Sequence, residues 1–355
     1  MGMLKQVVVL PALYLLGGCQ LVFSLSDPAP QDAADAPPDG FGFPAGVTKL
    51  AGAPSAHGLL LNKNYVYYTT SDFASLANQV GRVSLSDGVV EPLSANEPAV
   101  QNVFTPDDTS IYWTTWQPGE LRAIDKVTVL GAMTLATFDG PAFAFAIPDA
   151  NGAPLAPSHS MGHFYELPTP PSGPLQPTWS ATTDLGKYSG ITGAVIRDGE
   201  LFWTNQTEDP TTGGVFSMNI AEAKAGNPTI RTWVLDDERA WGLVVTTEDI
   251  VYSRAGKIGV IGTSGVVRIP RGGGAPVELV RGRTNIRGIA VDGGDVYFAE
   301  HNGGGGIWKV PLDASESPLE VVENQRLPLH VAVDDKAIFW TSLDPIEGGV
   351  FRVAK

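Results

Sequence analysis

The stretch IFWTSLDPIEGGVFRV, at residues 338–353, contains the pattern that decides the fold of this chain. An aromatic and β-branched run ends at Thr341, a polar loop follows, and Gly349 then opens an alternation of apolar and polar residues. Aromatic and β-branched residues favour strands, and alternation with a period of two is typical of a strand with one buried face. The stretch therefore predicts two neighbouring antiparallel strands.

The glycine-led strand recurs through most of the 355-residue chain. Neighbouring copies lie 38 to 52 residues apart, a spacing typical of four-stranded propeller blades. Seven copies are found, and they begin at Gly81, Gly119, Gly162, Gly214, Gly265, Gly306 and Gly349. This period indicates a repeat protein built from small sheets.

A polar turn and then an aromatic or β-branched run precede six of the seven copies, at residues 65–69, 111–114, 201–204, 250–252, 296–298 and 338–341. The third copy instead follows Ala153, Pro154 and Leu155, with no aromatic residue. The sequence thus predicts an all-β chain in which residues 47–355 form a seven-bladed β-propeller. A six-bladed propeller stays open if the third unit is an insertion.

The two ends of the repeat region predict how the ring closes. Other units continue into an outer strand, for example at residues 276–280 and 318–322, whereas only six residues follow Gly349. Residues 47–51 match those outer strands and have no blade of their own. We expect them to complete the last blade, which removes an exposed sheet edge.

The aromatic run followed by Thr resembles the YWTD and NHL propeller groups, and also the repeat-rich propeller lipoproteins of environmental bacteria. The resemblance covers about residues 47–355 and implies the fold rather than an activity. YWTD domains usually have six blades and carry an Asp after the Thr. Here that position holds Thr70, Thr115, Asn205 and Ser342, so the binding properties of that group are not expected.

The N-terminus predicts a targeting signal and a tether. Residues 1–18 contain Lys5 and a short apolar run and end in a lipobox-like Leu16-Gly17-Gly18 before Cys19, the only cysteine. Residues 19–46 follow as a lipidated Cys and a flexible Pro/Ala/Asp-rich linker. By resemblance to enteric lipoproteins, Gln20 after the Cys favours the outer membrane, facing the periplasm or the surface. The alternatives are a cleaved signal with a chance Cys and an uncleaved membrane anchor.

Composition and motifs exclude several function classes. A net charge of −15 repels phosphate backbones, so no nucleic acid partner is expected. The sequence has no zinc-protease helix, nucleophile elbow, P-loop or EF-hand loop. We predict no catalytic residue, no cofactor and a monomer, and we leave a divalent metal open.

Aligning the repeats places one set of loops on a single face of the propeller, around the central channel. The candidate ligand-binding residues on this face are His57, Asp72, His159, Arg254, Arg287, Glu300, His301, His330 and Asp344. Neutral imidazoles suit a divalent ion and arginines suit a carboxylate or phosphate. If histidines ligate, binding is expected to weaken below about pH 6. The competing interpretation is that these are ordinary solvated turns.

Two functions follow from these features. The first is a membrane-tethered, extracytoplasmic module that binds a protein, a glycan or a small molecule. The second is a metal-dependent propeller hydrolase or lyase acting at the central mouth.

The Cys19→Ser variant tests the tether. The native chain should partition into detergent and carry the added mass of two or three acyl chains, because Cys19 is the predicted acceptor. Recovery of Cys19→Ser in the membrane fraction at the native level would exclude the lipid anchor.

Overall fold

The computed structural model describes residues 44, 46–72, 77–116, 118–127, 131–137, 145, 147–148, 154–157, 163–172, 174–175, 179–180, 190–236, 238–302 and 304–355. All of them belong to one compact unit, Gly42–Lys355. The predicted signal peptide, Cys19, almost all of the linker and His159 lie outside the described residues.

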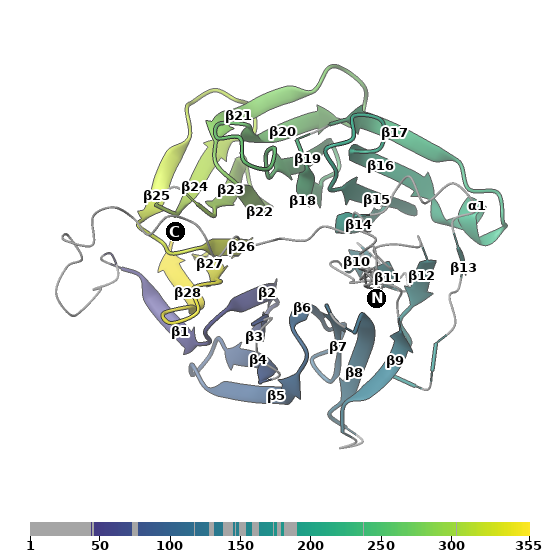
Figure 1. The fold of residues 1–355 in the computed structure, drawn as a ribbon, viewed down its shortest axis with the longest axis vertical. Helices are drawn as coiled ribbons and strands as arrows, with labels where there is room; N and C mark the ends of the chain where they lie inside the picture. Colours follow the sequence, from purple (N-terminus) through teal and green to yellow (C-terminus); the bar gives the residue numbers. More distant parts are fainter. Residues whose placement is uncertain are drawn as a thin grey trace, which may run out of the picture. The chain divides into compact units, whose positions relative to one another are not determined.

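Strands form small antiparallel sheets that follow one another around a ring, as Figure 1 shows. Blade 1 consists of β2 (Ala56–Leu61), β3 (Tyr65–Thr70), β4 (Asn78–Ser84) and β5 (Val90–Glu97). Blade 2 consists of β6 (Val100–Phe104), β7 (Ser110–Thr115), β8 (Glu120–Asp125) and β9 (Met133–Thr137). Blade 4 consists of β14 (Ile191–Arg197), β15 (Glu200–Asn205), β16 (Gly214–Asn219) and β17 (Ile230–Leu235).

The later blades repeat the arrangement. Blade 5 consists of β18 (Ala240–Val245), β19 (Asp249–Arg254), β20 (Ser264–Pro270) and β21 (Val277–Arg283). Blade 6 consists of β22 (Ile286–Asp292), β23 (Asp295–Glu300), β24 (Gly306–Pro311) and β25 (Leu319–Glu323). Blade 7 consists of β26 (Pro328–Val333), β27 (Ala337–Ser342), β28 (Gly349–Ala354) and β1 (Thr48–Gly52). The prediction of an all-β propeller is confirmed.

The third unit differs from these six complete blades, as its degenerate sequence suggested. It contains a three-stranded sheet of β11 (Leu155–Pro157), β12 (His163–Glu166) and β13 (Trp179–Ser180). Tyr165 packs in one core cluster with Leu121 of blade 2, and Leu155 packs in another with Trp203 of blade 4. The short strand β10 (Ile147–Pro148) pairs in parallel with β14. Among the described residues the propeller thus has six complete blades, with a smaller sheet between blades 2 and 4.

The first strand closes the ring. β1 pairs antiparallel with β28, with Thr48 opposite Arg352 and Gly52 opposite Gly349. Ala51 of β1 packs in one cluster with Phe339 of blade 7 and Tyr68 of blade 1. The expectation that residues 47–51 complete the last blade is confirmed.

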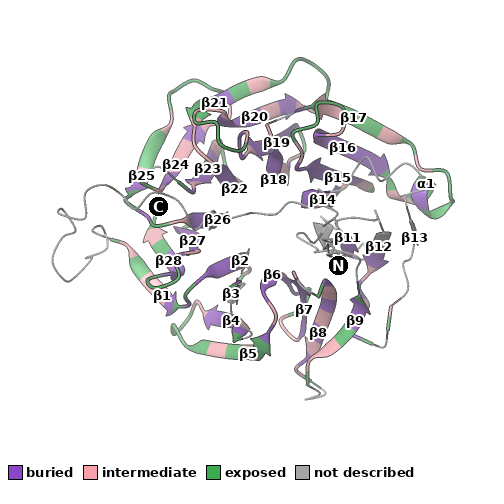
Figure 2. Ribbon diagram, viewed as in Figure 1, coloured by how far each residue is buried: buried purple, intermediate pink, exposed green. Residues whose placement is uncertain are grey.

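Aromatic side chains of the second strands fill the space between blades. Phe202 of blade 4 packs with Tyr252 of blade 5, and Trp340 of blade 7 packs with Tyr297 of blade 6. Trp113, Trp203 and Trp340 are fully buried, whereas the outer strands are partly exposed (Figure 2). Burial of each large side chain contributes roughly 1.5–3 kcal/mol, so the aromatic residues of the repeat hold neighbouring sheets together.

The hydroxyl that follows the aromatic pair bridges neighbouring inner strands. Thr204 Oγ1 accepts from the backbone N–H of Gly193 in its own blade at 2.8 Å and donates to the Trp241 carbonyl of the next blade at 2.6 Å. Ser253 makes the same two contacts between blades 5 and 6, and Thr69 makes them between blades 1 and 2. These hydroxyls therefore tie blade 1 to blade 2, blade 4 to blade 5 and blade 5 to blade 6.

The same bridge closes the ring. Thr341 Oγ1 of blade 7 donates to the carbonyl of His57 in blade 1 at 2.8 Å and accepts from the backbone N–H of His330 at 3.3 Å.

Among the described residues the α-helical structure is confined to α1 (Ile220–Lys224), whose N-cap Asn219 accepts from two backbone N–H groups. Within the described part of the chain, no helix is both long and apolar enough to span a membrane.

Replacing the bridging hydroxyl should destabilise the ring. Thr204→Val leaves a buried backbone donor and acceptor unpaired, so the free energy of unfolding should fall by about 1–3 kcal/mol in urea titrations. Thr114 is the matched control, because its buried Oγ1 has no hydrogen-bond partner among the described residues. Thr114→Val should leave stability unchanged or raise it, and equal losses in both variants would contradict the bridging role.

Two truncations test closure. Deleting residues 20–43 should leave the melting temperature almost unchanged, whereas deleting residues 20–52 removes β1 and bares the edge of β28. The second deletion should cost several kcal/mol through lost strand pairing and exposed apolar side chains. The same melting temperature for both would show that β1 is dispensable.

Candidate ligand site at the mouth of the channel

Every inner strand of the complete blades carries the same irregularity at its start. The pairing of β2 with β3 shifts between Ala56 and Leu59, and β6, β14, β18, β22 and β26 shift at the equivalent place. Bulges of this kind redirect side chains and are common beside functional sites. The second residue of each inner strand therefore lies at an equivalent position around one end of the channel. These second residues are His57, Gln101, Thr192, Trp241, Arg287 and Leu329.

A second set of residues surrounds the same end. The residue after each second strand donates its backbone N–H to the residue before the inner strand, as His301 does to Asn285 at 3.1 Å. Several of the accepting residues have the left-handed backbone conformation, with φ of 54° at Asn285 and 60° at Arg239. These tight turns hold His301 against the inner strands, and we call this end of the channel the mouth.

Four titratable groups converge at the mouth. The rings of His57 and His330 lie with their centroids 5.6 Å apart, and Arg287 is close enough to lower the pKa of His57, His301 and His330 by its charge. His57 is 6% exposed, Arg287 2% and His301 1%. The structure thus brings together four of the residues that the sequence placed on this face.

Burial keeps these histidines neutral. Desolvation, followed by the charge of Arg287, lowers the pKa of His301 to about 3 and that of His330 to about 4. Burial and the neighbouring His330 hold the pKa of His57 well below its usual value. The expected weakening of histidine ligation near pH 6 therefore moves to about pH 3–4 for His301 and His330, because the ordinary pKa does not apply at the mouth.

The hydrogen bonds of the histidines are only partly satisfied. His57 Nδ1 lies 2.8 Å from the carbonyl of Gln101, and His301 Nδ1 lies 3.1 Å from that of Pro328. The Nε2 atoms of His301 and His330 are buried without a hydrogen-bond partner among the described residues. Buried polar atoms are normally paired, so these two Nε2 atoms are available to form hydrogen bonds with a ligand.

Two of the other predicted residues take part in local ion pairs. Arg254 forms ion pairs with Asp236 at 2.5 Å, Glu278 at 2.7 Å and Glu238 at 3.2 Å. Glu300 pairs with Arg283 at 3.3 Å. Both side chains are occupied by structural contacts.

The two predicted aspartates lie in loops. Asp344 caps its own turn by accepting from the backbone N–H groups of Ile346 and Glu347, and it pairs with Arg326 at 3.6 Å. Asp72 is exposed, and its backbone carbonyl and N–H bond the side chain of Asn78. His159 lies outside the described residues.

The register of the last blade corrects one detail of the repeat alignment. Pro328 pairs with Ser342 and Val331 with Trp340, so Leu329 is equivalent to His57 and His330 to Gly58. His330 thus lies one residue deeper along the channel than the alignment implied. The sequence offered no means of locating the bulge, because Leu329 and His330 both fit an inner strand.

Two further residues at the mouth escaped the sequence analysis. Arg239 lies nine-tenths buried before β18, and Asn285 accepts from Nε of Arg287 at 3.0 Å. Both occupy the left-handed position before an inner strand. The sequence signal that could have found them is a polar residue directly before an inner strand, which Arg239 and Asn285 are.

The channel contains a cavity of about 350 Å³. Its walls come from the inner strands, with Trp241, His330, Asn102 and Thr192 among mostly apolar residues such as Leu60 and Ile289. This volume lies in the range of small-ligand sites. A site at the mouth therefore continues into a partly open cavity lined mostly by apolar residues.

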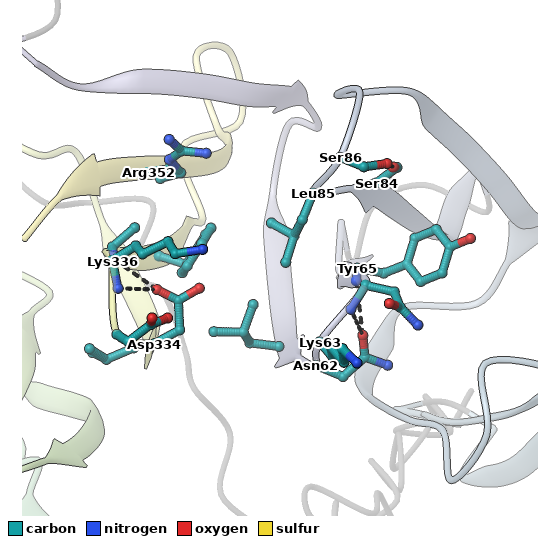
Figure 3. A pocket seen from close by; sticks show the side chains of 15 residues that line it. Asn62, Lys63, Tyr65, Ser84, Leu85, Ser86, Asp334, Lys336 and Arg352 are labelled. Carbon is teal, nitrogen blue, oxygen red and sulfur yellow. Dashed lines mark hydrogen bonds between the residues drawn. The ribbon is translucent and has the colours of Figure 1, made fainter.

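A larger groove of about 790 Å³ lies on the opposite face, between blades 7 and 1 (Figure 3). Asp334 and Lys336 line it on one side and Asn62 and Tyr65 on the other. Its polar side chains mostly serve their own turns, since Asp334 accepts from Lys336 N at 2.8 Å and Asn62 accepts from Tyr65 N at 2.9 Å. We place the candidate site at the mouth because buried groups there lack partners.

A metal was left open by the sequence. Among the described residues, no group of three or more His, Cys, Asp or Glu side chains is arranged to hold a metal ion.

Comparison with known proteins supports the fold and no particular family. No protein-family model matches the chain, and no curated protein matches it. Among solved structures, a catalytically inactive histidine-to-alanine variant of virginiamycin B lyase from Staphylococcus aureus, with quinupristin, superposes with a TM-score of 0.62 at 15% identity, covering 87% of this chain and 99% of that one.

Two other similar structures are unrelated to the lyase by name. U3-55K superposes with a TM-score of 0.62 at 10% identity, covering 88% of this chain and 100% of that one. The computationally designed protein Ika8 superposes with a TM-score of 0.56 at 14% identity, covering 84% and 83%. These likenesses agree on a β-propeller and leave the activity open.

Acid should destabilise the chain through the buried histidines. Their pKa values are lowered on folding, so the unfolded chain binds more protons below its ordinary pKa of about 6.5, and stability falls from there toward pH 3–4. At pH 5 the loss for His301 should be roughly 2 kcal/mol at most. His301→Asn keeps a donor toward Pro328 and does not titrate, so urea titrations at pH 7 and pH 5 should give it a smaller loss than the parent. An unchanged loss would contradict the assignment.

Proposed function

We propose that this protein is a cell-envelope lipoprotein, anchored through Cys19, whose β-propeller is a non-catalytic module that binds a ligand at its mouth. The lipobox-like sequence and the acidic, Pro-rich residues 26–39 support the anchor and tether. The rigid ring supports a binding role, because propellers present loops around a central channel. The proposal includes an outer-membrane location and a monomeric state.

The single observation that carries the binding role is the cluster at the mouth. His57, His301 and Arg287 lie buried beside the half-buried His330, and the Nε2 atoms of His301 and His330 have no partner among the described residues. An unpaired buried polar atom costs roughly 1–3 kcal/mol. A core made only for stability gains nothing from such groups, whereas a ligand that pairs with them would recover the cost.

A thermal-shift screen of small sugars, peptides and organic acids, followed by paired variants, tests this proposal. Ligands that raise the melting temperature of the parent should fail to do so in the double variant His57→Ala/His330→Ala, because both imidazoles face the mouth. The control pair Asp198→Ala/Asp334→Ala changes turns on the opposite face and should keep the response. Survival of binding in the histidine pair, or an equal loss in both pairs, would reject the mouth as the site.

A metal-dependent hydrolase or lyase is the second candidate. The Nε2 atoms of His301 and His330, which lack a partner in the described part of the chain, favour it, since neutral imidazole is a common metal ligand. The similar lyase supports only the fold at 15% identity. Metal analysis of the purified chain separates the candidates, because a stoichiometric divalent ion lost in His57→Ala/His330→Ala would favour the enzyme.

A further inference from the structure

Arg287 is a buried cation without a counter-charge. Its side chain belongs to a residue that is 2% exposed, and its Nε donates to the neutral amide oxygen of Asn285 at 3.0 Å. Among the described residues no carboxylate pairs with it, whereas Arg254 of the neighbouring blade contacts three. Burying a charge without a partner is strongly unfavourable. An anion bound to the terminal nitrogens of Arg287 would therefore stabilise the folded protein.

The surroundings of Arg287 offer an aromatic face and further positive charge. Its guanidinium lies over the ring of Trp241, 4.6 Å from the ring centroid. Burial, and after it the positive charge of Arg239, lower the pKa of Arg287 to about 9. The group is still charged at neutral pH, and its contact with the Trp241 ring is a cation–π interaction, which leaves its N–H donors available to a ligand.

The histidines beside Arg287 offer acceptors rather than donors. A backbone carbonyl only accepts, so the contacts of His57 Nδ1 with Gln101 and of His301 Nδ1 with Pro328 place the imidazole proton on Nδ1. In the neutral ring Nε2 then carries a lone pair. A ligand that satisfies the mouth must bring an anionic group to Arg287 and hydroxyl donors to the histidines.

We propose that the mouth binds a hydroxy-carboxylate, with its carboxylate on Arg287 and its hydroxyl groups on Nε2 of His301 and His57. This inference rests on the proposed function, whose site it shares. Trp241 and His330 line the channel cavity of about 350 Å³, which gives the rest of such a ligand room beside the charged group. A phosphate dianion fits less well, because its second negative charge would face the lone pairs of neutral imidazoles.

The first test uses four probes on the purified chain from residue 44 onward, which contains all the described strands. The probes are gluconate, its neutral counterpart sorbitol, acetate and inorganic phosphate, compared at equal ionic strength. Gluconate at about ten times its dissociation constant should raise the melting temperature by about 2–4 °C, because it binds only the folded state. Sorbitol and acetate should give smaller shifts at the same concentration. A larger shift with phosphate, or equal shifts with gluconate and sorbitol, would overturn the proposal.

Two arginine variants distinguish an anion-binding role of Arg287 from a purely structural one by their melting temperatures with and without gluconate. Arg287→Met keeps the packing on Trp241 and removes the unpaired charge, so it should raise the melting temperature without ligand and abolish the gluconate shift. Arg254→Met is the matched control. It leaves Asp236 and Glu278 without their ion-pair partner, so it should lower the melting temperature and keep the shift produced by gluconate. Destabilisation by Arg287→Met, or a gluconate shift that persists in it, would refute the anion site.

Failure here is distinguishable from failure of the proposed function. If ligands of another class raise the melting temperature and depend on His57 and His330 while gluconate does not bind, the mouth is a binding site and the hydroxy-carboxylate is wrong. If gluconate binds the parent and still binds both His57→Ala/His330→Ala and Arg287→Met, the hypothesis that the mouth is the ligand site is wrong.

Discussion

The ring depends on a side-chain hydroxyl that bridges two blades, supplied by Thr69, Thr204, Ser253 and Thr341. The Thr or Ser at the end of the second strand satisfies a backbone donor of its own inner strand and an acceptor of the next one, as Thr204 and Ser253 do. For Thr69, Thr204 and Ser253 the donor belongs to a glycine whose Cβ would lie within 3 Å of the neighbouring strand, 2.8 Å from the Trp241 carbonyl at Gly193. The close approach and the hydroxyl are therefore two parts of one arrangement. Where Ala299 replaces the hydroxyl residue, a Cβ on Gly288 would come within 2.3 Å of the Leu329 carbonyl.

This arrangement explains which parts of the fold the sequence could predict. The aromatic run, the hydroxyl residue and the glycine-led strand are local and recur in most units, so the propeller fold and its closure by residues 47–51 could be predicted. The count of seven blades was wrong, because the third glycine copy does not belong to a complete four-stranded blade among the described residues, and the structure supports the six-bladed alternative. The third unit lacks the aromatic run and forms only the three-stranded sheet β11–β13. The bulges at the start of each inner strand left no trace in the pattern, because both registers place an apolar or neutral residue in the sheet. The repeat alignment therefore equated His330 with His57, whereas in the structure Leu329 is equivalent to His57.

The candidate site was only half predictable for a different reason. Repeat alignment can place a residue on a face, but it cannot say whether a neighbour satisfies its charge. Arg254, Glu300 and Asp344 are matched by residues of their own or adjacent loops. Arg287 and His301 are not, and that difference appears only when the loops are in place. A chain with a net charge of −15 thus encloses a small, desolvated region in which positive charge and neutral acceptors dominate.

Closure of the last blade also sets the order of assembly. β1 and β28 are separated by almost the whole described chain, and the bond from Thr341 to His57 joins residues 284 positions apart. Contacts between such distant residues form slowly, because the entropy of closing the loop must be overcome before they contribute. Blades 1, 2, 4, 5 and 6 can each form from a local run of sequence, whereas blade 7 needs β1 as well as β26, β27 and β28. The mouth, which needs His57 and His330 side by side, comes into existence only at that final step, so a partly folded chain has blades but no binding site.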